Sequence, residues 1–186
     1  MFSKGDTQIS GGQRPAIAYI GLGSSLGDRK AHLQEALQRL QATGTEIQIT
    51  ASSPLYESPH LGLEPGDSEK YPPHLNLVVA VETFLTPEAL LQTVQRVETL
   101  GQRQRTQHWG PRTIDMDILV YSSVRVETPE LTLPHPGIAE RAFVVLPFAD
   151  IAPDFRLPDG RTLWELCQTE NIRSQQIWRY GDELLL

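Results

Sequence analysis

The stretch Leu75 to Gly101, LNLVVAVETFLTPEALLQTVQRVETLG, contains signals for a strand and a helix in succession. Leu75 to Phe84 is apolar and rich in β-branched residues, which is typical of an interior strand. Thr86-Pro87-Glu88 then supplies an N-cap, a proline at the first helical position and an early acid. The buried face of the predicted helix, which ends near Gly101, carries apolar residues at helical spacing, namely Leu90, Leu91, Val94 and Val97.

The residues before this stretch predict a second helix between two strands. Ala16 to Ile20 is a short apolar run that stops at the glycine-rich segment Gly21 to Asp28, as a buried strand followed by a tight loop would. Ile47 to Ala51 alternates apolar and polar residues, which indicates another strand before the turn-rich stretch Ser52 to Pro73. The helix between them is indicated by Leu33, Ala36, Leu37 and Leu40, and Gly44 closes it.

The residues after Gly101 complete a known order of strands and helices. Ile114 to Tyr121 predicts a fourth strand, so the sequence reads β-α-β-β-α-β. This is the split βαβ, ferredoxin-like α+β sandwich, in which an antiparallel sheet carries both helices on one face and leaves the other free for a ligand. We expect a C-terminal hairpin from 124–126 and 131–133, a helix over 138–149 and a last amphipathic segment over 162–168.

Length and composition predict one domain. The chain has 186 residues, enough to bury one substantial core. A hydrophobic fraction of 39% and a charged fraction of 21% exclude a fully disordered chain and a charge-rich coiled coil. Residues 1–14 have almost nothing to bury, so we expect a flexible N-terminal extension followed by a single domain over residues 15–186.

Charge and cysteine usage narrow the choice of partners. The net charge of −7 argues against general nucleic-acid binding, so an anionic ligand needs a local basic patch. The single Cys167 excludes an intrachain disulfide framework. No window approaches 18 consecutive apolar residues, and the first residues lack the apolar region of a signal peptide. We therefore expect a cytoplasmic protein with no nucleic-acid or membrane partner.

The densest chemical signal is the segment Gln102 to Asp117. Its three arginines lie in a stretch from Thr99 to Ile114 that contains no acid, and the stretch leads directly into two carboxylates. In a strand the period of two places Asp115 and Asp117 on one face. Converging side chains at that spacing could hold two Mg²⁺ ions about 3.5 to 4 Å apart.

Two interpretations compete for this carboxylate pair. An isolated Asp-x-Asp is more often the solvated outer face of a half-exposed strand. However, aspartate is depleted in strands, and two carboxylates on one face repel each other unless a cation shares their space. The nearby arginines could supply that cation, but arginines, Mg²⁺ and carboxylates together are the usual equipment for binding polyphosphate. The residues favour phosphoryl or nucleotidyl transfer over a simple ion pair.

Three further features have a structural and a functional interpretation. The pattern Gly21-x-Gly23-x-x-Leu26 lacks the last glycine of a dinucleotide fingerprint, and a tight strand-to-helix turn accounts for it. Asn76 lies in an apolar run, so its amide needs a partner, either a backbone group or a flat heterocycle. His135 stands between two prolines, which predicts a rigid turn or a contact with phosphate or ribose.

Together these segments closely resemble the 6-hydroxymethyl-7,8-dihydropterin pyrophosphokinase family of folate biosynthesis. The resemblance runs from about Ala18 to Pro158, and its most specific part is WGPRTIDMDIL at 109–119. Gln102, His74 and Ser25 depart from the family pattern, and His74 stands where the family commonly has an aromatic residue. The other matching segments are YIGLGSSLGD at 19–28, YESPHLG at 56–62, LN at 75–76, QRVE at 95–98, LPHP at 133–136 and ERAF at 140–143.

The resemblance implies an enzyme that transfers the pyrophosphoryl group of ATP to the hydroxymethyl oxygen of the pterin and releases AMP. It implies that Asp115 and Asp117 hold two Mg²⁺ ions, that Arg103 and Arg112 stabilise the transferring group, and that the arginine-rich loop orders over ATP as a lid. We expect a monomer. The implied ATP site is Gln95, Glu98, Arg105, Trp109, Arg112, Ile118, Thr132, His135 and Arg141, and the implied pterin site is Ser58, Pro59, Leu61, His74, Asn76 and Phe143.

Two other functions stay open at this point. Another Mg²⁺-dependent, ATP-using transferase on the same fold would share the aspartate pair but would not accept the pterin. A non-enzymatic RNA-binding module of the same topology would need exposed aromatic and basic residues on its sheet. The outer-face candidates here are Asp115 and Asp117, which argue against RNA.

Overall fold

The computed structural model describes residues 14–60, 72–101, 113–181 and 184. Nearly all of the predicted N-terminal extension and of the arginine-rich lid lies outside these residues. The elements before the second helix are β1 (Ala16–Ser24), α1 (Arg29–Gln41), η1 (Gly44–Glu46), β2 (Ile47–Ser52), β3 (Leu55–Ser58) and β4 (His74–Thr83). They are followed by α2 (Pro87–Leu100), β5 (Asp115–Tyr121), β6 (Val126–Glu127), β7 (Thr132–Leu133), η3 (Ile138–Glu140), α3 (Ala142–Ile151), α4 (Leu163–Cys167), α5 (Glu170–Arg173) and β8 (Trp178–Gly181).

The main sheet is antiparallel and confirms the predicted split arrangement. Its order is β5-β1-β4-β3-β8, and β2 pairs with the end of β4 that β3 does not reach. β1 lies between β4 and β5, its register running from Ala16 opposite Thr83 to Ser24 opposite Leu75. β6 and β7 form the predicted hairpin as a separate pair.

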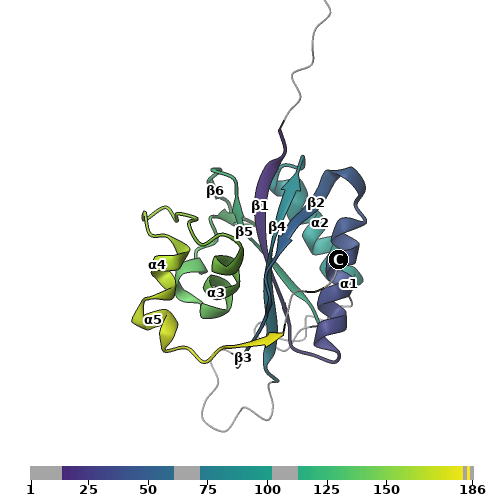
Figure 1. Cartoon of the computed structure of the whole chain (residues 1–186). Helices are drawn as coiled ribbons and strands as arrows, with labels where there is room; N and C mark the ends of the chain where they lie inside the picture. Colours follow the sequence, from purple (N-terminus) through teal and green to yellow (C-terminus); the bar gives the residue numbers. More distant parts are fainter. Residues whose placement is uncertain (1–13, 61–71, 102–112, 182–183, 185–186) are drawn as a thin grey trace, which may run out of the picture.

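The two sequence-predicted helices start where their capping residues stand. The side chain of Asp28 accepts a hydrogen bond from the Ala31 N–H at the start of α1, and that of Thr86 accepts one from Ala89 at the start of α2. Both helices pack on one face of the sheet, as predicted (Figure 1). Between the helices and the sheet lies a core of alternate strand residues, among them Ala18, Ile20 and Leu22 of β1.

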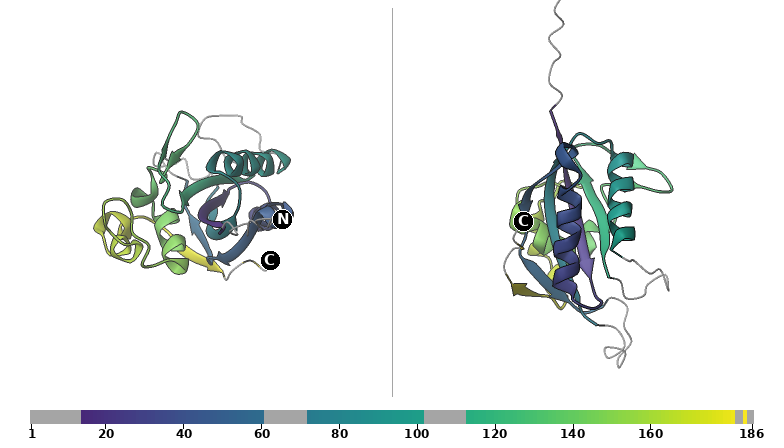
Figure 2. Two further views of the ribbon diagram at one scale, coloured as in Figure 1. Left: turned by 90° about the horizontal axis from the view of Figure 1, so that it is seen from above. Right: turned by 90° about the vertical axis from the view of Figure 1, so that its right-hand side faces the viewer.

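The opposite face is not left free, which corrects the sequence-based expectation. α3 packs against part of it, and α4 and α5 pack on α3, so the sheet lies between two helical layers (Figures 1 and 2). Phe148 of α3 is fully buried there, with its ring centroid 4.5 Å from that of Tyr19 and 5.3 Å from that of Phe155. A second apolar core therefore anchors the C-terminal helices and confines any ligand to the part of this face that they leave open.

Other boundaries also differ from the prediction. β1 continues through Gly21 and Gly23 to Ser24, so half of the expected glycine loop is strand. The stretch expected to be only turn-rich contains β3, and β8 was not predicted. The helix expected over 138–149 is the short η3 followed by α3.

No helix within the described ranges is both long and apolar enough to cross a bilayer.

Candidate active site

The candidate site is a pocket whose floor includes two alternate glycines of β1. Gly21 and Gly23 lie on the face opposite the α1–α2 core and line the pocket. In the sheet register Gly21 stands between Val78 and Asp117, and Gly23 stands between Asn76 and Asp115. Because neither glycine has a side chain, a ligand can approach the backbone between β4 and β5.

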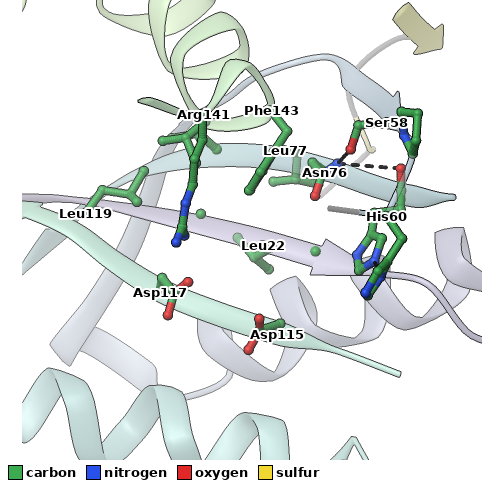
Figure 3. Close-up of a pocket in the computed structure, with 16 residues that line it drawn as sticks. Leu22, Ser58, His60, Asn76, Leu77, Asp115, Asp117, Leu119, Arg141 and Phe143 are labelled. Atoms are coloured by element: carbon green, nitrogen blue, oxygen red, sulfur yellow. Dashed lines mark hydrogen bonds between the residues drawn. The ribbon is translucent and has the colours of Figure 1, made fainter. Parts of the chain in front are cut away.

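Asp115 and Asp117 form one end of the pocket. Both side chains project from β5 toward the open face, as the period of two predicts, while Met116 between them is buried in the α1–α2 core (Figure 3). The Met116 N–H donates a 2.9 Å hydrogen bond to Oε1 of Glu98 on α2. This buried bond fixes the strand at the point from which the two carboxylates project.

The carboxylate pair has the donor chemistry of a magnesium site. Within the described ranges no cluster of three or more His, Cys, Asp or Glu side chains is placed to hold a metal ion. Mg²⁺ does not need such a cluster, because it retains several waters and is usually held by one or two carboxylates together with substrate phosphates. The hard oxygen ligands of Asp115 and Asp117 fit that mode of binding.

Arg141 faces the carboxylates from the other layer. It is the residue just before α3, and its guanidinium extends across the pocket toward Asp117 (Figure 3). Its Cζ lies 5.9 Å from the centre of the Phe143 ring. A Cβ atom on Gly137 would stand 2.9 Å from that Cζ, so glycine at this position leaves the space that the guanidinium occupies.

His135 is held beside this charged end. The Gly137 N–H donates a 3.1 Å hydrogen bond to Nδ1 of His135. Burial is the main cause that lowers the pKa of His135, Arg141 adds to the lowering, and the two β5 carboxylates oppose it. The imidazole is therefore neutral at neutral pH, with Nδ1 as acceptor and the proton on Nε2.

The opposite end of the pocket is lined by groups that hydrogen-bond to one another. Asn76 of β4 is 5% exposed, and its Nδ2 donates a 3.0 Å hydrogen bond to Oγ of Ser58 on β3. A second, longer contact of 3.5 Å joins Nδ2 to the carbonyl oxygen of His74. The partner that the buried amide requires is thus a side chain of the neighbouring strand, and the amide still lines the pocket.

Two histidines meet at this end. Nδ1 of His60, which is labelled in Figure 3, lies 2.8 Å from Nε2 of His74, and both residues line the pocket. Phe143, at the start of α3, lines the same pocket from the other layer. The pocket therefore has one end of carboxylates and a guanidinium, and another end of ring and amide groups, with a floor of bare backbone between them.

The structure brings together only some of the residues predicted from the sequence. Glu98 and the side chain of Ile118 are buried on the α1–α2 side of the sheet, and Gln95 and Thr132 are exposed. Neither these four nor His135 are among the pocket-lining residues. The pocket contains Ser58, Pro59, His74, Asn76, Asp115, Asp117, Arg141 and Phe143, whereas Leu61, Arg103, Arg105, Trp109 and Arg112 lie outside the described residues.

The sequence interpretation missed several lining residues. Gly21 and Gly23 were explained as a turn, and His60 was absent from the predicted site. Their positions in the sequence could have indicated a role in the pocket. The two glycines alternate along one strand, and His60 directly follows the predicted site residues Ser58 and Pro59. Leu119 and Val144 also line the pocket, but as ordinary apolar residues they offered no signal of function.

Comparison with known proteins identifies close relatives. The family model "7,8-dihydro-6-hydroxymethylpterin-pyrophosphokinase (HPPK)" matches residues 19–153. A curated 2-amino-4-hydroxy-6-hydroxymethyldihydropteridine pyrophosphokinase from Pseudomonas aeruginosa is 42% identical over 83% of this chain and 93% of its own. The proteins of the same name from Methylorubrum extorquens and Bacillus subtilis are 43% and 40% identical, over 80% and 73% of this chain and 89% and 77% of theirs.

Solved structures show the same fold. The wild-type HPPK-DHPS of Plasmodium falciparum superposes with a TM-score of 0.63 at 16% identity, over 90% of this chain and 48% of that one. An A437G form solved with SDX-DHP gives the same TM-score over 84% of this chain and 46% of that one. The chain thus spans a little under half the length of these solved chains, and at this identity the likeness concerns the fold alone.

Proposed function

Because the chain belongs to the 7,8-dihydro-6-hydroxymethylpterin-pyrophosphokinase family, and so transfers the pyrophosphoryl group of ATP to hydroxymethyldihydropterin in folate biosynthesis, we propose that the transfer takes place in the pocket above β1. The observation that carries the proposal is the division of one pocket into a charged end and a ring-binding end. A pterin and a triphosphate need those two chemistries side by side, since the hydroxymethyl group must meet the phosphate chain.

The ring-binding end accepts the pterin. Asn76 offers an amide whose orientation the Ser58 hydroxyl fixes, and its Oδ1 stands 3.1 Å from where a Cβ on Gly23 would lie, at the floor of the pocket. A pterin edge carries ring N–H, amino and carbonyl groups that complement an amide. In this proposal the rings of His74 and Phe143 enclose the faces of the pterin, and Pro59 lines the same pocket. Leu61 is assigned to the pterin site on the strength of the family motif alone.

The charged end accepts the triphosphate. In this proposal Asp115 and Asp117 hold two Mg²⁺ ions, and a divalent cation bound there neutralises charge on the phosphate oxygens. Arg141 places a fixed positive charge opposite Asp117, and the neutral His135 presents Nε2–H as a donor. Glu98 lies on the opposite side of the sheet from the pocket and acts indirectly. Its hydrogen bond from the Met116 N–H fixes the strand segment that carries both carboxylates.

The chemistry needs alignment and charge neutralisation more than a strong base. Phosphoryl-type transfer passes through a loose transition state in which charge spreads over the peripheral oxygens. Residues that hold the pterin hydroxyl in line with the β-phosphorus therefore supply much of the rate. The proposal assigns the charge on the transferring group to Arg103 and Arg112, and further ATP contacts to Gln95, Arg105, Trp109, Ile118 and Thr132, on the strength of the family motifs alone.

We also propose that the enzyme works as a monomeric, cytoplasmic single domain. The size of the chain and its single cysteine support this proposal. Size-exclusion chromatography with light scattering at micromolar concentration is expected to give the mass of one chain, and a dimer mass would contradict the proposal.

The product nucleotide tests the reaction. Incubation of the enzyme with Mg·ATP and 6-hydroxymethyl-7,8-dihydropterin is expected to yield AMP and the pterin diphosphate in equal amounts, resolved by anion-exchange chromatography. ADP as the nucleotide product would contradict pyrophosphoryl transfer, because transfer of a single phosphoryl group releases ADP. Omission of the pterin should suppress AMP formation, which separates transfer from ATP hydrolysis.

A further inference from the structure

The His60–His74 pair is a contact between two side chains whose backbones are separately held. His74 pairs with Ser58 in the β3–β4 ladder. The carbonyl of Pro73, just before it, accepts a 2.7 Å hydrogen bond from Arg29, which also forms a 2.6 Å ion pair with Glu57. The backbone of His74 is therefore held on both sides, and His60 contacts its imidazole.

The geometry of the pair is that of a hydrogen bond made end to end. The two ring nitrogens are 2.8 Å apart and the ring centroids 5.0 Å apart, with an angle of 34° between the ring planes. If the two rings were stacked, the distance between their centroids would be much closer to the distance between the two nitrogens. One nitrogen carries the proton and the other accepts it, so each ring restrains the tautomer and the rotamer of its partner.

A metal ion bridging the same nitrogens fits less well. Two imidazole nitrogens that share a tetrahedral zinc ion, each about 2.0 to 2.1 Å from it, stand roughly 3.3 to 3.4 Å apart with their lone pairs converging. The observed 2.8 Å contact would have to open and both rings would have to turn. The pair is therefore a direct contact of two side chains.

We propose that His60 is a positioning residue for pterin binding: it holds the His74 imidazole in the orientation that forms one wall of the ring-binding end. This inference rests on the proposed function, because it takes the pterin to occupy the end of the pocket that Asn76 lines. His74 presents its imidazole at this end of the pocket, and the hydrogen bond with His60 supplies a restraint on its orientation. His60 acts through His74 and has no part in the transfer itself.

The size of the effect follows from side-chain freedom. Immobilising one side chain on binding costs about 0.5 to 1.5 kcal/mol, which corresponds to roughly a two- to twelvefold change in affinity. His60→Ala removes this hydrogen bond, so the His74 imidazole has more rotational freedom to lose when the pterin binds. We expect the KM for the pterin to rise about three- to tenfold, while the KM for ATP and the thermal midpoint stay at their wild-type values.

A conservative variant separates positioning from mere bulk. His60→Asn places an amide near the former Nδ1, where it can donate to or accept from Nε2 of His74. It should restore most of the pterin KM, whereas His60→Leu, which has comparable bulk and no polar atom, should behave as His60→Ala does. Equal KM values for the asparagine and leucine variants would overturn the proposal.

A double-mutant cycle completes the test. His60→Ala is measured alone and in the His74→Ala background, with steady-state kinetics for both substrates. If His60 acts through His74, it has no further effect once His74 is gone, and the two changes are strongly coupled. Additive effects, an equal rise in the KM for ATP, or no change on His60→Ala would each refute the inference.

Asn76→Ala distinguishes this failure from failure of the proposed function. If Asn76→Ala raises the pterin KM but the histidine cycle shows no coupling, only the role of His60 is wrong. If Asn76→Ala leaves the pterin KM unchanged, the pterin does not occupy this end of the pocket, and both proposals fail together.

Discussion

The sheet has one face that α1 and α2 cover and another that α3 covers only in part, with α4 and α5 packed on α3. On the covered face, alternate residues of β1, such as Ala18, Ile20 and Leu22, are all buried in one apolar core. On the other face the same strand carries the exposed Ile17, then Tyr19 packed against Phe148, and then two glycines. The pocket lies where the second helical layer ends and the strand has no side chains.

This difference separates stability from function along a single strand. Residues that point toward α1 and α2 contribute buried apolar area, which is the main source of stability. Residues that point the other way near Gly21 and Gly23 leave space or carry charge, which contributes little to folding and is available for a ligand. Substitutions on the pocket face should therefore lower activity and leave stability unchanged, whereas substitutions on the covered face should lower stability and leave the activity of the folded protein unchanged.

Loss of a pocket-face carboxylate is expected to have the largest effect on activity. Asp115→Ala or Asp117→Ala removes half of the proposed Mg²⁺ site, so AMP formation at saturating substrate should fall at least about a hundredfold. Because Asp117 is exposed and Asp115 only half-buried, the thermal midpoint should stay near the wild-type value. Turnover close to wild type in either variant would show that the metal does not bind there.

A substitution on the covered face should reverse this signature. Ile20→Ala removes a side chain that is 0% exposed in the α1–α2 core, and truncating such a residue costs about 2 to 5 kcal/mol of unfolding free energy. Urea denaturation should record that loss. The variant should retain near-native turnover per folded molecule at low temperature, and a loss of turnover as severe as that in Asp117→Ala would contradict the division between the faces.

The two glycines of the floor offer a smaller and sharper test. A Cβ on Gly23 would lie 3.1 Å from Oδ1 of Asn76, whereas the atoms nearest to a Cβ on Gly21 belong to the Leu119 side chain, at an ordinary 3.6 Å. Gly23→Ala should therefore displace the amide and raise the KM for the pterin several-fold. Gly21→Ala is the matched control and should have a clearly smaller effect on that KM. Equal values in the two variants would show that crowding at Asn76 does not matter.

Much of the fold could be predicted from the sequence because its signals are local. The alternation of apolar residues and the capping residues Asp28 and Thr86 determine strands and helices over a few neighbouring positions. Two strands escaped prediction. β3 and β8 are four residues each, too short for a periodic signal, and they exist because β4 and then β3 offer unpaired strand edges.

The candidate site divides in the same way. That Asp115 and Asp117 share a face follows from the period of a strand and needs no tertiary information. That they stand across β1 from Asn76 follows from the pairing of β1 with both β4 and β5, which depends on residues far apart in the chain. The roles assigned to Arg103 and Arg112 stay predictions from the motif.

By itself, the sequence determined the order of the two long helices and of the four strands predicted around them, the shared face of the two aspartates and the family. Only the tertiary structure decided that Gly21 and Gly23 are a pocket floor, that α3 covers part of the second face, and that His60 meets His74. The physical reason is the separation along the chain of the residues that interact. Periodicity and capping act between residues a few positions apart, whereas strand register, layer packing and side-chain pairing depend on contacts that form only when distant segments fold together.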